Sequence, residues 1–149
     1  MASAWDKLQE QIRAQMREIY SETVVEHNLN PRNLGSFPDA DGFARVTGPC
    51  GDTMEIWLKV AGNTIVKAGF ATDGCTTTIA SGSMTTEMAK GKSLTEALQI
   101  SQKDVLDALD GLPEESEHCA FLAANTLKEA IRDHLEMERH SWKRPYRRY

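Results

Sequence analysis

The sequence predicts a single α+β domain: a three-stranded antiparallel sheet packed against a C-terminal set of helices, with an N-terminal amphipathic helix before both. Two observations lead to this prediction. Alternating apolar and polar residues are confined to 43–72, whereas the flanking segments carry apolar residues near helical spacing. Strands in one run and helices in another are typical of α+β proteins. The length of 149 residues and the hydrophobic content of 40% suit one modest core.

The first segment has the pattern of an amphipathic helix. Its apolar residues stand near helical spacing among charged ones and are Trp5, Leu8, Ile12, Met16, Ile19 and Val24. The pattern ends in a turn-rich stretch, Asn28 to Gly42. We therefore expect one helix before the sheet.

Three short strands are expected next. Phe43 to Thr47 is the first, and Met54 to Val60 is the second, because its residues alternate as in a half-buried strand. Gly62 and Asn63 are typical of a tight hairpin turn, which leads into the third strand, Thr64 to Thr72. Hairpin connections make the sheet antiparallel.

The remainder is predicted to be helical. The first three expected helices are Thr76 to Lys90, Leu94 to Ile100, and a short one from Ser101 to Gly111. Hydroxyl residues begin the first and are able to cap it, and Ser93 with Glu96 forms a capping box for the second. The last helix is the longest, and we expect its apolar face to pack on the sheet. That face comprises Cys119, Leu122, Ala123, Leu127, Ala130, Ile131 and His134.

The charge of the chain is unevenly distributed. Residues 139–149 contain five Arg and Lys and no acid, and the other 12 of the chain's 17 basic residues stand with all 22 acidic ones in 1–138. We expect 1–138 to form the domain and 139–149 a basic aromatic tail. Such a tail can bind nucleic acid, or it can rest on the acidic body or on a partner, as chain ends often do. We favour the second explanation, so no nucleic-acid partner is expected.

Neither a membrane segment nor an export signal is apparent. No apolar run approaches the ~18 residues that cross a bilayer, and Met1 to Gln11 lack the layout of a secretory signal. An odd number of cysteines, three, favours reduced thiols over a disulfide framework. We therefore expect a soluble cytoplasmic protein whose thiols are available for metal or sulfur chemistry.

The three cysteines occur at the predicted ends of helices and strands. Cys50 and Asp52 stand two residues apart before the central strand, where an extended backbone would point both side chains to the same side. Cys75 lies between the third strand and a helix, and Cys119 follows His118 at the start of the last helix. At both helix starts the helix dipole favours thiolate over thiol. Side chains from different segments could thus converge.

Such a set would bind a soft metal. Thiolates suit zinc or iron bridged by sulfide, while aspartate and histidine are harder donors that hold these metals less firmly. The separations of the cysteines do not fit paired Cys-x-x-Cys knuckles, which argues against a zinc ribbon. Three scattered cysteines can also be small buried hydrophobic residues, so the spacing alone leaves both explanations open.

Longer motifs favour a shared metal site over three separately buried cysteines. They are YSETVVEHNLNPRNLGS (Tyr20 to Ser36), GPCGD (Gly48 to Asp52), GFATDGCTTTIASGS (Gly69 to Ser83) and LPEESEHCAFLA (Leu112 to Ala123). In this order and spacing, and over about Glu18 to Leu135, they resemble the U-type iron-sulfur cluster assembly scaffold family, that of IscU and of the N-terminal domain of NifU.

The resemblance implies a scaffold rather than an enzyme, on which a transient iron-sulfur cluster, expected to be 2Fe-2S, is built from iron and sulfur and passed on. It implies that Cys50, Cys75 and Cys119 hold the cluster, that Asp52 weakens its retention, and that His118 is an alternative ligand. The implied partners are a cysteine desulfurase, an electron donor such as a ferredoxin, and recipient apo-proteins. Zinc is a further candidate for the same site in the protein as isolated.

Cys119 is the thiol expected to receive sulfur from the desulfurase first. A persulfide acceptor must be a reachable thiolate, and Cys119 begins a helix beside His118, after the polar stretch Glu114 to Glu117. The glutamates of that stretch oppose the thiolate in part. The resemblance points to the same cysteine.

Two alternatives and one departure from the family pattern remain. Leu112 to Ser116 reads LPEES where the chaperone-dependent branch has Leu-Pro-Pro-Val-Lys, which argues against release by the dedicated chaperone. The main alternative function is a zinc-binding sulfur carrier, a related branch that typically lacks the histidine found here as His118. An enzyme with Cys119 as its nucleophile is disfavoured, because neighbouring helical residues point about 100° apart.

Overall fold

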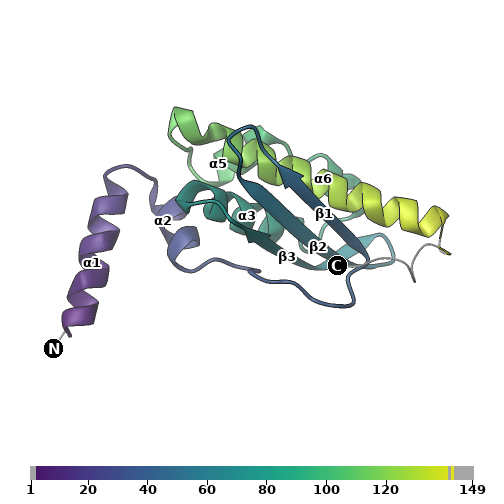
Figure 1. Cartoon of the computed structure of the whole chain (residues 1–149), viewed down its shortest axis with the longest axis horizontal. Coiled ribbons are helices and arrows are strands. Elements are labelled where there is room, and N and C mark those ends of the chain that lie inside the picture. Colours follow the sequence, from purple (N-terminus) through teal and green to yellow (C-terminus); the bar gives the residue numbers. More distant parts are fainter. Residues whose placement is uncertain (1–2, 141, 143–149) are drawn as a thin grey trace.

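The computed structural model of the chain describes residues 3–140 and 142. Its centre is an antiparallel sheet in the order β1-β2-β3, formed by β1 (Gly42–Thr47), β2 (Thr53–Ala61) and β3 (Thr64–Thr72). Helices cover one face of this sheet, while the N-terminal helix stands apart at one end of the molecule (Figure 1). The predicted α+β class and the three-stranded antiparallel sheet are therefore confirmed.

The alternation in β2 sets which residues form the core. Met54, Ile56 and Leu58 are fully buried in the main hydrophobic cluster with residues of the covering helices. Trp57, on the opposite face, is also buried, because Phe43 pairs with it across the sheet with 5.3 Å between the ring centroids. The outer face of the sheet is therefore partly covered.

The helices after the sheet follow the predicted order. They are α3 (Thr76–Ala89), α4 (Leu94–Leu98), α5 (Gln102–Ala108), a short 3-10 helix (Glu114–Ser116) and α6 (Glu117–Arg139). The capping box of Ser93 and Glu96 is present, and the predicted apolar face of α6 is buried. The expected hydroxyl cap of α3 is wrong, because Cys75 is the N-cap residue and makes no side-chain capping bond.

The N-terminal segment forms two helices rather than the single one predicted, α1 (Ala4–Arg17) and α2 (Glu22–Leu29). Ser21 separates them, because its side chain accepts a hydrogen bond from the N–H of Val24 and donates one to the carbonyl of Leu109. The first bond caps a new helix, and the second ties that helix start to the end of α5. The break is therefore set by a contact distant in sequence.

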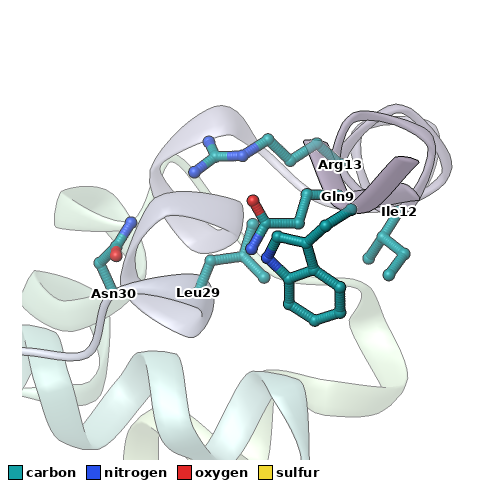
Figure 2. Close-up of a pocket in the computed structure, with 6 residues that line it drawn as sticks. Gln9, Ile12, Arg13, Leu29 and Asn30 are labelled. Carbon is teal, nitrogen blue, oxygen red and sulfur yellow. The ribbon is translucent and has the colours of Figure 1, made fainter. Parts of the chain in front are cut away.

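The apolar face of α1 is largely open to solvent, with Trp5 64% and Ile12 41% exposed. Figure 2 shows a pocket between α1 and α2, which is lined by Trp5, Gln9, Ile12, Arg13, Leu29 and Asn30. Of the predicted tail 139–149, the structure describes only residues 139, 140 and 142, and none of the described helices is long and apolar enough to cross a membrane.

His27 joins α2 to α3 through a buried hydrogen bond. Its Nδ1 lies 2.7 Å from Ser83 Oγ, which also accepts a bond from the backbone N–H of Arg32 at 2.8 Å. The hydroxyl hydrogen of Ser83 is therefore available to an unprotonated Nδ1. Burial lowers the pKa of His27, and the charge of Arg32 acts in the same direction. This histidine therefore has a structural role.

The pH dependence of stability tests this contact. Because the pKa of His27 is lowered in the folded chain, the unfolded chain binds this proton more readily, so the free energy of unfolding falls as the pH drops below about 6.5. His27→Gln should lose less stability than the wild type between about pH 7.5 and about pH 5.5 in urea unfolding. His140→Gln, near the end of α6, should follow the wild type. Equal losses in all three proteins would refute the assignment.

Candidate functional site

Three chain segments meet at one end of the sheet: the β1–β2 turn, the β3–α3 junction and the start of α6. Thr53 holds the first two together, since its carbonyl accepts the Thr72 hydroxyl at 2.6 Å and its N–H donates to Asp73 Oδ1 at 2.7 Å. The turn also lies over α6, because a Cβ placed on Gly48 would be 3.5 Å from a methyl of Leu122 (Figure 1). All five predicted site residues stand on these segments.

The β1–β2 turn separates Cys50 from Asp52. Its backbone closes with two bonds, from the Gly48 N–H to the Asp52 carbonyl at 2.8 Å and from the Gly51 N–H to the Gly48 carbonyl at 3.0 Å. Gly51 has φ +91°, so the backbone reverses between the two residues. The extended backbone expected between Cys50 and Asp52 is therefore wrong, because a turn separates them. Cys50 is exposed, whereas Asp52 is half-buried.

Cys75 follows Gly74 in the β3–α3 junction and is the N-cap residue of α3. Its carbonyl accepts the first helical bond of α3, from the N–H of Ile79 at 2.9 Å, and its thiol is exposed. The predicted place of Cys75 at a helix start is therefore correct. Its thiol and that of Cys50 are both open to solvent at this end of the molecule.

Cys119 differs from the other two cysteines in being 3% exposed. Its Sγ lies 3.3 Å from Thr77 Oγ1 and 3.4 Å from Thr78 Oγ1, both in the first turn of α3. The expectation that Cys119 is the most reachable thiol is wrong for this conformation, because Cys119 begins the buried face of α6. The preceding polar residues are also ordered, as the short 3-10 helix Glu114–Ser116.

His118 lies beside Cys119, with 3.7 Å between Nε2 and Sγ. The expected divergence of neighbouring helical residues therefore does not keep the imidazole of His118 away from the sulfur of Cys119. His118 is half-buried.

Thr78 is the site residue that sequence reasoning missed. Its hydroxyl donates to Asp52 Oδ2 at 2.9 Å and is also the Oγ1 that contacts Cys119. The available signal was the run of three threonines directly after Cys75, which sequence analysis interpreted only as capping residues. Thr78 connects two of the predicted ligands that come from different segments.

The predicted ligands lie on segments that meet, but they are not arranged as a finished metal centre. Within residues 3–140 and 142, no group of three or more His, Cys, Asp or Glu side chains is placed to hold a metal ion. In this conformation two of the three thiols are exposed and one is buried.

Comparison with known proteins gives a consistent family. Residues 19–141 match the family model described as the NifU-like N terminal domain. The chain is 50% identical over 118 residues to "Iron-sulfur cluster assembly scaffold protein IscU 1" of Archaeoglobus fulgidus, covering 78% of this chain and 77% of the relative. It is 45% identical over 120 residues to the Escherichia coli K12 scaffold protein IscU, covering 77% of this chain and 93% of the relative.

A solved structure has the same fold. The N-terminal NifU-like protein from Brucella abortus superimposes with a TM-score of 0.64, covering 81% of this chain and 97% of that one, at 19% sequence identity. At this level of identity the likeness shows the arrangement of strands and helices alone.

Gly74 tests how closely the β3–α3 junction is packed. A Cβ at this position would lie 2.6 Å from both Cβ and Oγ1 of Thr78, so Gly74→Ala forces one of the two residues to move. We expect the free energy of unfolding to fall by about 1–3 kcal/mol in urea titrations. Gly48→Ala, whose nearest contact would be an ordinary 3.5 Å, is the matched control and should change little. Equal stability of the two variants would contradict the close packing.

Proposed function

The chain belongs to the family of the NifU-like N terminal domain, and from this membership we propose that it is a scaffold on which an iron-sulfur cluster is assembled and then transferred to other proteins. The curated relatives are themselves named as iron-sulfur cluster assembly scaffolds. One structural observation adds most support: all three cysteines lie on the segments that meet at one end of the sheet. The cluster is cargo, not a permanent part of the protein.

The proposed ligands are Cys50, Cys75 and Cys119, with Asp52 or His118 as the fourth donor. Thiolates are the soft ligands that iron-sulfur clusters require. A carboxylate oxygen or an imidazole in the fourth place binds iron less firmly than a thiolate, which suits a cluster that has to leave. This donor set fits a 2Fe-2S cluster, whose two irons need four protein ligands.

Sulfur enters the proposed pathway by persulfide exchange at Cys119. The Cys119 thiolate attacks the terminal sulfur of a persulfide on a cysteine desulfurase, a new S–S bond forms at Cys119, and the donor cysteine leaves as a thiolate. Reduction of that sulfur to sulfide takes two electrons, which an electron donor such as a ferredoxin supplies. Because Cys119 is 3% exposed, this step needs the site to open.

The chain acts as a carrier rather than an enzyme in this proposal, since the cluster is formed from supplied iron and sulfur. The remaining partners are the recipient apo-proteins. Recognition by the dedicated scaffold chaperone is not expected, because the exposed Glu114 and Glu115 stand where that chaperone's motif has a proline and a valine. A cytoplasmic location remains part of the proposal.

Cluster assembly is the direct test of this function. Anaerobic protein given ferrous iron, cysteine and a desulfurase should develop the visible absorption of a 2Fe-2S cluster, with about two irons and two acid-labile sulfides per chain. Bound zinc with no acid-labile sulfide under all such conditions would contradict the scaffold and favour the sulfur carrier. Zinc found in protein purified in air does not distinguish the scaffold from the sulfur carrier, because thiolates bind both zinc and iron.

The position of the first persulfide tests the role of Cys119. After a brief single turnover with a desulfurase, mass spectrometry should find the additional sulfur mainly on Cys119, and Cys119→Ser should load at least about tenfold more slowly. Cys75→Ser is the matched control and should load at the normal rate. A persulfide mainly on the exposed Cys50 or Cys75, with normal loading of Cys119→Ser, would exclude the assignment.

A further inference from the structure

Thr78 occupies an unusual position between two polar groups. It is fully buried, its Oγ1 donates to Asp52 Oδ2 at 2.9 Å, and the same oxygen lies 3.4 Å from Cys119 Sγ. A hydroxyl has one hydrogen, and an ionised carboxylate only accepts. The hydrogen of Thr78 therefore goes to Asp52, and only its lone pairs face the sulfur.

We propose that the Thr78 hydroxyl is a latch that keeps Asp52 docked beside Cys119 in the cluster-free chain and has to release both before Cys119 can react. Thr78 is thus a positioning residue that acts through Asp52. The proposal rests on the proposed function for its purpose, because the latch controls access to the buried thiol of the scaffold.

Two features make Thr78 suited to this task. Its side chain is confined against Gly74, where there is no room for even one additional carbon, so its hydroxyl is held in place by packing. Its partner Asp52 closes the β1–β2 turn through the bond from the Gly48 N–H. A bond to the Asp52 carboxylate therefore ties this turn to the first turn of α3.

Thr77 provides an internal control. Its Oγ1 contacts the same sulfur at 3.3 Å and its side chain is also buried. In the described part of the chain, however, the hydroxyl bond to Asp52 comes from Thr78 and not from Thr77. A latch therefore predicts different results for two neighbouring threonines that both contact Cys119.

The test measures access to Cys119 in the reduced, metal-free full chain. The rate of Cys119 alkylation by iodoacetamide, followed by mass spectrometry, should rise about tenfold in Thr78→Val, because a hydrogen bond to a charged group is lost while the shape is kept. Thr78→Ser keeps the hydroxyl and should react at the wild-type rate. Thr77→Val should stay within about twofold of the wild type. The exposed Cys75 serves as the reference thiol in each protein.

A substitution of Asp52, the half-buried acceptor, tests the same hydrogen bond. It remains informative if Thr78→Val does not fold. Asp52→Ala should raise the Cys119 rate about as much as Thr78→Val, and the double variant should be no faster than either single one, since both remove one interaction. Hydrogen exchange of the amides in 48–53 should become faster in Thr78→Val. A purely electrostatic effect on the Cys119 thiol would leave that exchange unchanged.

Three results would overturn the latch: faster alkylation in Thr78→Ser than in Thr78→Val, which indicates packing; equal effects of Thr77→Val and Thr78→Val; or an unchanged Cys119 rate in Asp52→Ala. None of these measurements uses iron, sulfide or a desulfurase. The latch can therefore fail while the chain still assembles a cluster, and cluster assembly can fail while the latch holds.

Discussion

The close packing of α6 across the sheet is the constraint on which the rest of the structure depends. A Cβ on Gly42 would lie 2.5 Å from the carbonyl oxygen of Ala130, so β1 and α6 approach to a distance that only glycine permits. Ala130 and Cys119 belong to the same buried face of α6, and Cys119 lies near its start. The candidate site is therefore a continuation of the hydrophobic core.

Because the candidate site continues the hydrophobic core, the three thiols have different environments. Cys50 and Cys75 stand on a turn and on a helix cap, beyond the ends of the core, and are exposed. Cys119 belongs to the core itself, where its sulfur contacts Thr77 and Thr78 of α3, and Thr78 also binds Asp52 of the turn. In the proposed site two thiols are open and one is covered, which would protect Cys119 until a partner opens the site.

The sequence predicted the local structure, but it did not predict the features that depend on contacts between residues distant in sequence. The strands, the Gly62 turn and the Ser93 capping box follow from residues near one another, and all were predicted. The break before α2 depends on a bond from Ser21 to Leu109, and the burial of Cys119 depends on α3. The five candidate site residues were named from their predicted positions at element ends and from the family motifs, whereas their conformations required the fold.

The central claim is that one cluster is held by cysteines from all three segments, including the buried one. The most direct measurement is the iron and acid-labile sulfide content of Cys50→Ser, Cys75→Ser and Cys119→Ser after identical anaerobic reconstitution, with each variant first shown to be folded. Our account predicts that each variant retains well under half of the wild-type cluster, because each loses one of the few thiolates available. Full cluster content in Cys119→Ser would contradict it, since Cys119 would then be a core residue and not a ligand.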